Sequence, residues 1–137
     1  MIGLLIITHE ALGKAYVRVA EHFFGDVPPH LRIISVKKND APEWLREEVA
    51  SSLQVLDSGN GVLVLGDIFG ATPCNSAQNV IQNQVIQHKK VIMLTGLNVP
   101  MAVKALQYSG SRTDLSQLAE EVKTAAINGI VAVKYEE

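Results

Sequence analysis

The sequence predicts an α/β fold: a single doubly wound domain with a mainly parallel sheet, helices on both faces and a short extra C-terminal strand. Short apolar runs alternate along the chain with segments whose apolar residues recur at helical spacing, as successive β-α units require. The 137 residues are 47% hydrophobic and 19% charged, which suits one domain with a substantial core. We therefore expect residues 1–137 to form one domain.

The first half of the chain shows the alternation clearly. Ile2–Ile7 is a nearly continuous apolar run, typical of a strand buried on both faces. A helix is expected over residues 10–24, and Pro28-Pro29 separates it from a second strand at Leu31–Val36. The apolar residues that define this helix at helical spacing are Leu12, Tyr16, Val19 and Phe23.

The second helix has a start signal and a buried stripe. Asp40 and Glu43 have the spacing of a capping box, in which Asp40 accepts backbone N–H bonds and Glu43 reaches back. Asn60-Gly61 is a turn signal that precedes a third strand at Val62–Leu65. The stripe consists of Leu45, Val49, Leu53 and Leu56.

The second half continues the pattern with its own caps. Thr72-Pro73 predicts the start of a third helix that runs to about Gln87. Asn98 and Asp114 precede two further helices, the first ending at Tyr108 and the second, with Leu115, Leu118 and Val122 on its inner face, at Asn128-Gly129. The remaining strands are expected at Val91–Leu94 and Ile130–Val133.

We expect the four main strands in the order 2-1-3-4, which places a switch point between the first and third strands. Ligands of such sheets bind outside the carboxyl ends of the strands at that point. The last strand is too close to the C-terminus to be placed, and it would pair at an edge, on this subunit or on another.

Composition excludes several classes of protein. No stretch approaches the roughly 20 apolar residues that a membrane span needs. The N-terminus lacks the basic region and cleavage site of a secretory signal. The net charge is -2 and no basic stripe occurs, so nucleic acid is not expected as a partner. The lone Cys74 forms no internal disulfide, as suits a reducing cytoplasm.

Two polar residues follow the strands that flank the switch point. His9 follows the first strand and Asp67 the third, so the predicted sheet order brings them together. A carboxylate bonded to one imidazole nitrogen fixes the tautomer and leaves the lone pair of the other nitrogen free. The pair therefore predicts a histidine nucleophile with an aspartate that orients it, although the sequence leaves open which nitrogen reacts.

A candidate anion site follows Asp67. Gly70 and Ala71 allow the backbone to approach a ligand closely, and Thr72 precedes Pro73 at the predicted start of a helix. Free N–H groups at a helix start bind anions. We therefore expect a phosphate-binding segment at Gly70, Ala71 and Thr72, beside a nucleophile. Phosphoryl transfer needs little beyond such positioning and charge stabilisation.

Plainer interpretations compete with each residue. His22 is expected to be solvated, His30 to lie in a loop and His88 near a helix end. Cys74 fits a small buried residue of a helix better than a nucleophile. A metal site built from His9, Asp67 and Cys74 has no recognisable ligand spacing, so we expect no metal.

Three segments of the chain, taken in order, form a recognisable set. Leu4–His9 is an apolar strand that ends in a histidine, Gly66–Asn75 has the order aspartate–aromatic–glycine–small–Ser/Thr–Pro–x–Asn, and Gly96–Met101 reads Gly-x-Asn-x-Pro-Met. Together they resemble the mannose-type enzyme IIA family of the bacterial phosphoenolpyruvate-dependent sugar phosphotransferase system, in which a histidine after the first strand is phosphorylated. The likeness covers essentially the whole chain.

The resemblance implies a phosphoryl carrier without cofactor or metal. His9 would accept the phosphoryl group from the phosphocarrier HPr, and Asp67 would hold its ring. Gly70, Ala71 and Thr72 would line the phosphate site. Asn98 would be an accessory residue that shapes its loop. The group would pass to an enzyme IIB-type or regulatory protein. Such proteins are cytoplasmic and commonly homodimeric through the last strand.

The chain also departs from the family pattern. Glu10, a further accessory candidate, follows His9 where a glycine or small polar residue is common, and it adds a second acid beside the histidine. Ala71 replaces a frequent glycine, and Cys74 a frequent phenylalanine.

Other functions stay open at this stage. A family member could act as a regulatory phosphoprotein without a sugar permease, or relay phosphate to a dihydroxyacetone kinase. A flavodoxin-like small-ligand binder is a third possibility, but no nucleotide-binding glycine pattern follows the first strand.

Overall fold

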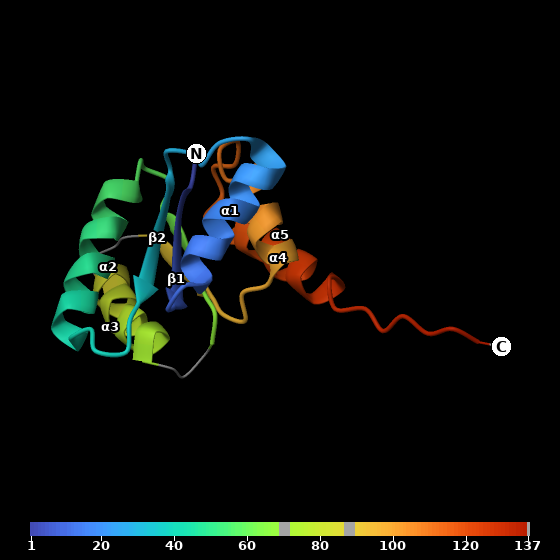
Figure 1. Cartoon of the computed structure of the whole chain (residues 1–137). Helices are drawn as coiled ribbons and strands as arrows, with labels where there is room; N and C mark the ends of the chain where they lie inside the picture. The colour runs from blue at the N-terminus through green and yellow to red at the C-terminus, as the bar shows by residue number, and fades with distance from the viewer. Residues whose placement is uncertain (69–71, 87–89, 137) are drawn as a thin grey trace.

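The computed structural model describes residues 1–68, 72–86 and 90–136, without the side chains of residues 72–74 and 84–86 (Figure 1). Strands and helices alternate as predicted, and both ends of the second and fourth strands agree with the sequence pattern. The elements are β1 (Gly3–His9), α1 (Leu12–Phe24), β2 (Leu31–Val36), α2 (Pro42–Leu56), β3 (Val62–Gly66), α3 (Thr72–Ile86), β4 (Val91–Leu94), α4 (Val99–Tyr108) and α5 (Leu115–Asn128).

The described strands form one parallel sheet in the predicted order β2-β1-β3-β4. In the register, Ile7 of β1 lies opposite Ile34 of β2 and Gly66 of β3. The carboxyl ends of β1 and β3 are therefore neighbours, and the residues that follow them, at the switch point, must meet at one edge.

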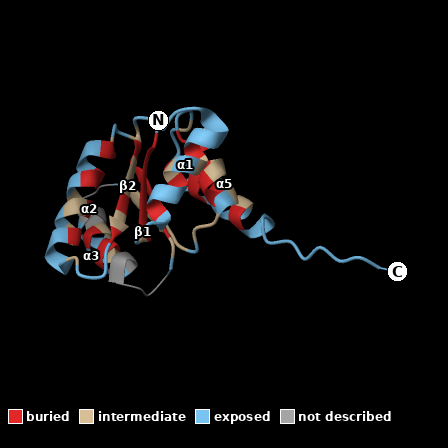
Figure 2. Ribbon diagram, viewed as in Figure 1, coloured by how far each residue is buried: buried red, intermediate tan, exposed pale blue. Residues whose placement is uncertain are grey.

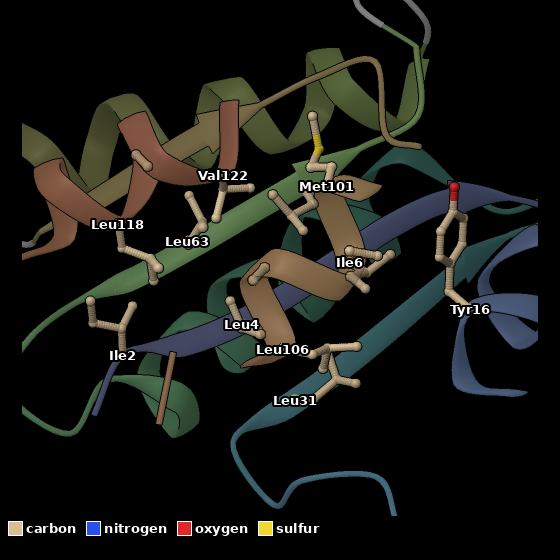
Figure 3. Packing of buried hydrophobic residues seen from close by; sticks show 14 of the residues in the cluster. Ile2, Leu4, Ile6, Tyr16, Leu31, Leu63, Met101, Leu106, Leu118 and Val122 are labelled. Atoms are coloured by element: carbon tan, nitrogen blue, oxygen red, sulfur yellow. The ribbon is translucent and has the colours of Figure 1, made fainter. Parts of the chain in front are cut away.

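Helices cover both faces of the sheet (Figure 1), because the residues of each strand alternate between two apolar layers. Leu4 and Ile6 pack with α1, α4 and α5, while Leu5 and Ile7 pack with α2 and α3. These four side chains are at most 1% exposed. Each contributes about 1.5–3 kcal/mol relative to exposure. Figure 2 shows the buried centre, and Figure 3 the layer that includes α4 and α5.

The buried stripe of α1 differs from the predicted one. Leu12 and Phe23 are 43% and 56% exposed, and the buried residues are Gly13, Tyr16 and Ala20. Gly13 allows the helix to approach the sheet, because a Cβ there would lie 2.5 Å from the hydroxyl of Ser35. The apolar period predicted the helix correctly, but the two small residues on its buried side carry little hydrophobic signal.

The capping box predicted for α2 is wrong. The helix begins at Pro42 with Ala41 as its N-cap, and no side chain caps it. The Asp40 carboxylate instead accepts the backbone N–H of Lys37 at 2.7 Å, which closes a turn before the helix. The Asp40 carboxylate therefore bonds a nearby backbone N–H of the preceding turn and not one of the free N–H groups at the start of α2.

The strand predicted at Ile130–Val133 is absent. Residues 130–136 are exposed and adopt no regular structure, and they extend away from the sheet and its helices (Figure 1). The side chains of Ile130, Val131 and Val133 are 79%, 69% and 69% exposed. Across the described ranges, β4 pairs only with β3, so its other edge is open. A strand needs a neighbour, and this segment has none within the described part of the chain.

The helices described here include none that combines the length and the apolar character needed to span a membrane.

Candidate functional site

His9 and Asp67 meet at the switch point, as the sequence predicted. Two nitrogens of His9, the backbone N–H and the ring Nδ1, each lie 2.9 Å from the same oxygen, Oδ2 of Asp67. His9 ends β1 and Asp67 directly follows β3, so the parallel pairing of these strands fixes the separation of the two residues. One carboxylate oxygen thus holds both the backbone and the ring of the histidine.

Asp67 is held as an anion by its donors. Burial alone would raise the pKa of its carboxyl, but bonds from the backbone and the ring of His9, the charge of His9 and the N–H of Ile68 together lower the pKa. The Ile68 N–H donates to the second oxygen, Oδ1, at 2.9 Å. Both oxygens therefore have bonded partners, and the group is ionised at neutral pH.

The two side chains differ in accessibility, and the difference matters for chemistry. The side chain of Asp67 is 7% exposed and that of His9 is 43% exposed. An ionised carboxylate only accepts hydrogen bonds, so Nδ1 carries the proton in the neutral ring. Nε2 then keeps its lone pair on a histidine that solvent or a partner can reach. This arrangement suits nucleophilic attack, with Asp67 opposite the resulting positive charge.

A cavity of about 290 Å³ lies beside His9. Glu10 and the segment after β2 contribute to its wall, and the lining residues are His9, Glu10, Val36, Lys37, Lys38, Asp40, Pro42 and Leu45. No role for the two lysines was predicted, since a lysine pair after a strand is an ordinary surface feature. Only the register of β1 with β2 brings them to His9.

Tyr16, which the sequence pattern placed only on the apolar side of the first helix, is a neighbour of this site. Its hydroxyl donates to the backbone oxygen of Leu97 at 3.4 Å. Burial raises the pKa of Tyr16, and the charge of Asp67 raises it further, so the phenol remains a neutral donor. The Leu97 N–H donates to Gly66 O at 3.0 Å. The loop before α4 is thereby fixed next to the strand end that carries Asp67.

Asn98 holds the same loop. Its Oδ1 accepts the N–H of Met101 at 2.9 Å and caps α4, which begins where the sequence predicted a helix. Its Nδ2 donates to the backbone oxygen of Ala126 in α5 at 3.0 Å. Both ends of the amide are occupied by the two helices, and no bond joins it to His9 or Asp67 among those described.

The predicted phosphate segment lies largely outside the described residues. This applies to Gly70 and Ala71, and to the side chains of Thr72 and Cys74. The backbone of α3 nevertheless begins at Thr72, as expected. The metal site considered for His9, Asp67 and Cys74 includes one of these side chains, so it is not tested.

The other histidines are separate from this site where they are described. His22 is exposed on α1, and His88 lies outside the described residues. His30 lies before β2, at the opposite end of the sheet, with its Nε2 2.8 Å from the hydroxyl of Ser109. Burial lowers the pKa of His30, and the charge of the chain N-terminus lowers it further.

A family model described as "PTS system fructose IIA component" matches residues 3–123. The chain belongs to this family of IIA components of the phosphotransferase system. The mannose-specific EIIAB component of Escherichia coli K12 is 27% identical to this IIA component over 133 residues, which are 97% of the chain and 40% of that relative. The chain thus spans about two fifths of the length of that relative.

Solved structures agree with the observed fold of the IIA component. Phosphotransferase system component EIIA from Streptococcus agalactiae superposes with a TM-score of 0.84 at 23% identity, covering 96% of this chain and 97% of that one. The mannose/sorbose-specific IIA subunit from Enterococcus faecalis gives 0.81 at 20% identity, covering 99% and 97%. The α/β fold with sheet order 2-1-3-4 is therefore the fold of known IIA proteins.

Proposed function

We propose that this IIA component is a phosphoryl carrier that accepts phosphate from HPr on Nε2 of His9 and passes it to an enzyme IIB-type acceptor. The Nε2 lone pair forms a bond to phosphorus while the bond to the donor's histidine nitrogen breaks. The Nδ1 proton stays in place, and Asp67 stabilises the positive ring. One observation carries this proposal: Oδ2 of Asp67 lies 2.9 Å from both the backbone nitrogen and the ring Nδ1 of His9.

The phosphoryl group would rest on the start of α3. Gly70, Ala71 and Thr72 are the residues proposed to contact it. The start of α3 at Thr72 supports this placement, because the first turn of a helix leaves backbone N–H groups free for an anion. No metal or organic cofactor is required, since a phosphohistidine donor is already activated.

The protein partners would dock around His9 at the carboxyl ends of the strands. Leu12, Ile68 and Val99 are 43%, 58% and 44% exposed, and they follow β1, β3 and β4 in the chain. Exposed apolar side chains around a reactive residue suit a transient protein contact. HPr and the acceptor would use this surface in turn, in the cytoplasm.

We also propose that the protein is a homodimer. The apolar segment Ile130–Val133 is extended and exposed, and β4 has an open edge in the described part of the sheet. A cavity of about 610 Å³ lies along Lys90–Ile92 and Thr113–Ser116, beside that edge. Pairing of the segment with the β4 edge of a second copy would satisfy both features.

The carrier proposal is tested by labelling. The purified protein is mixed with labelled phosphoenolpyruvate, enzyme I and HPr, and the phosphoresidue is mapped by mass spectrometry at mildly alkaline pH. We expect acid-labile label on His9, lost in His9→Ala and retained when His22, His30 or His88 is replaced. A folded wild-type protein that takes no label from active donors would refute the proposal. Subsequent transfer to an enzyme IIB protein would separate sugar transport from a regulatory role.

A further inference from the structure

The turn that follows His9 has an unusual backbone. Glu10 has a φ of 47°, and it is the only non-glycine residue with a positive φ among those the structure describes. A residue with a Cβ rarely adopts this left-handed conformation. Such a conformation persists where the surroundings hold it, and it often accompanies a functional site.

Two hydrogen bonds hold Glu10 in this conformation. Its backbone N–H donates to Val36 O at 2.8 Å, one step beyond the β1–β2 ladder. Its side-chain Oε1 accepts the backbone N–H of Lys38 at 3.1 Å, although the residue as a whole is exposed. The left-handed turn brings the carboxylate back to the loop between β2 and α2.

These bonds make Glu10 the counterpart of Asp67 on the other side of His9. Asp67 holds the N–H and the ring of His9 from the β3 side. Glu10 ties the next peptide to the β2 side, and Lys38 belongs to the wall of the same cavity as His9. The peptide that carries the histidine is thus fixed from both neighbouring strands.

We propose that Glu10 is a positioning residue for phosphoryl transfer at His9, acting through the hydrogen bond from the Lys38 N–H to its carboxylate. This bond holds the His9–Glu10 peptide and the loop at Lys37-Lys38 in the arrangement that the phosphoryl donor meets. The inference rests on the proposed carrier function. In this inference Glu10 acts through geometry and not through its charge. A glutamine at this position keeps the acceptor oxygen and loses the negative charge, so it should keep the positioning effect.

Three substitutions of Glu10 separate the effect of its hydrogen bond with the Lys38 N–H from the effects of its negative charge and of its positive φ. Glu10→Gln keeps an acceptor without the charge, Glu10→Ala removes the acceptor, and Glu10→Gly removes it while relieving the cost of the positive φ. Glu21→Ala on the exposed side of α1 is the matched control. Transfer from phosphorylated HPr is followed by rapid quench, and the His9 ring is followed by ¹⁵N NMR in the unphosphorylated protein.

We expect kcat/KM to fall by roughly ten- to a hundredfold in Glu10→Ala and Glu10→Gly, because small misplacements of reacting groups have effects of this order. Glu10→Gln should remain within about threefold of wild type, a rescue that a role of the charge would not give. The ring signals of His9 should move in the alanine and glycine variants and stay in place in the glutamine variant.

Several results would overturn the inference. One is a glutamine variant as slow as the alanine variant, which would assign the effect to charge. Another is a glycine variant as fast as wild type, which would show that the bond is dispensable. If wild-type protein accepts no phosphate, the carrier proposal fails, and the NMR comparison of the alanine and glutamine variants still decides whether Glu10 positions His9.

Discussion

Replacing Asp67 by asparagine changes one atom at the centre of the site. Oδ2 accepts two bonds from His9 and Oδ1 accepts one from Ile68, all at 2.9 Å. An asparagine has one acceptor oxygen and one NH2 group in the same places. In either orientation, the NH2 group faces a backbone N–H, from Ile68 or from His9. The most favourable orientation keeps the oxygen toward His9 and gives up the Ile68 bond.

The expected loss follows from the charge of that oxygen. Even in the favourable orientation, the ring that becomes positive during transfer faces a neutral amide. Hydrogen bonds that involve a charged group contribute about 1.5–3 kcal/mol. Losing a contribution of that size in the transition state slows transfer by roughly ten- to a hundredfold. His9 would still be present and accessible, so transfer is slowed and not abolished.

The assay is single-turnover transfer from phosphorylated HPr, with Asp57→Asn as the matched control. The carboxylate of Asp57 also accepts two backbone bonds, from Gly59 at 2.8 Å and Gly61 at 3.2 Å, but it lies at the other end of β3. Asp57→Asn should lower the stability of the protein and leave its transfer rate unchanged. A transfer rate of folded Asp67→Asn within twofold of wild type would refute the reasoning. So would an equal loss of transfer rate in both variants.

Three further predictions concern stability. The lowered pKa of Asp67 means that its carboxylate stabilises the fold fully above about pH 4, the usual aspartate range, and loses this effect as pH falls through the lower folded value. The difference in unfolding free energy between wild type and Asp67→Asn, from urea titrations, should therefore shrink below pH 4; a constant difference would contradict this. Gly13→Ala should lower the melting temperature, because crowding against Ser35 costs about 1–3 kcal/mol and outweighs the gain in helix propensity of about 1 kcal/mol. Asn98→Ala should cost about 1–2 kcal/mol in chemical denaturation through loss of the α4 cap, whereas Asn98→Asp should recover part of it.

The sheet and the central pair could be predicted from the sequence because both depend on strong local signals. Ile2–Ile7 and Val62–Leu65 are apolar runs typical of buried parallel strands, and right-handed crossovers restrict the order in which strands pair. Once β1 and β3 are neighbours, His9 and Asp67 must meet. Their proximity followed from topology, without any knowledge of side-chain conformation.

The misplaced details depend on contacts that a linear pattern does not contain. The Asp40 carboxylate could accept a backbone N–H either from the preceding turn or from the start of α2, and in the structure it accepts that of Lys37 in the turn. Phe23 satisfied the helical period, but the sheet meets α1 along the line of Gly13, where a small residue permits close approach. The bond from Lys38 to Glu10 joins residues 28 positions apart and depends on a backbone conformation that a glutamate rarely adopts.

The proposed pairing of residues 130–133 with the β4 edge of a second copy would make protein concentration an experimental variable. An extended segment that covers a strand edge in another molecule is held by mass action, so dilution releases it. Labelling at nanomolar protein and NMR at millimolar protein would then sample different assemblies of the same chain. We expect the melting temperature to rise with concentration, and rates compared between variants should be measured at one fixed concentration.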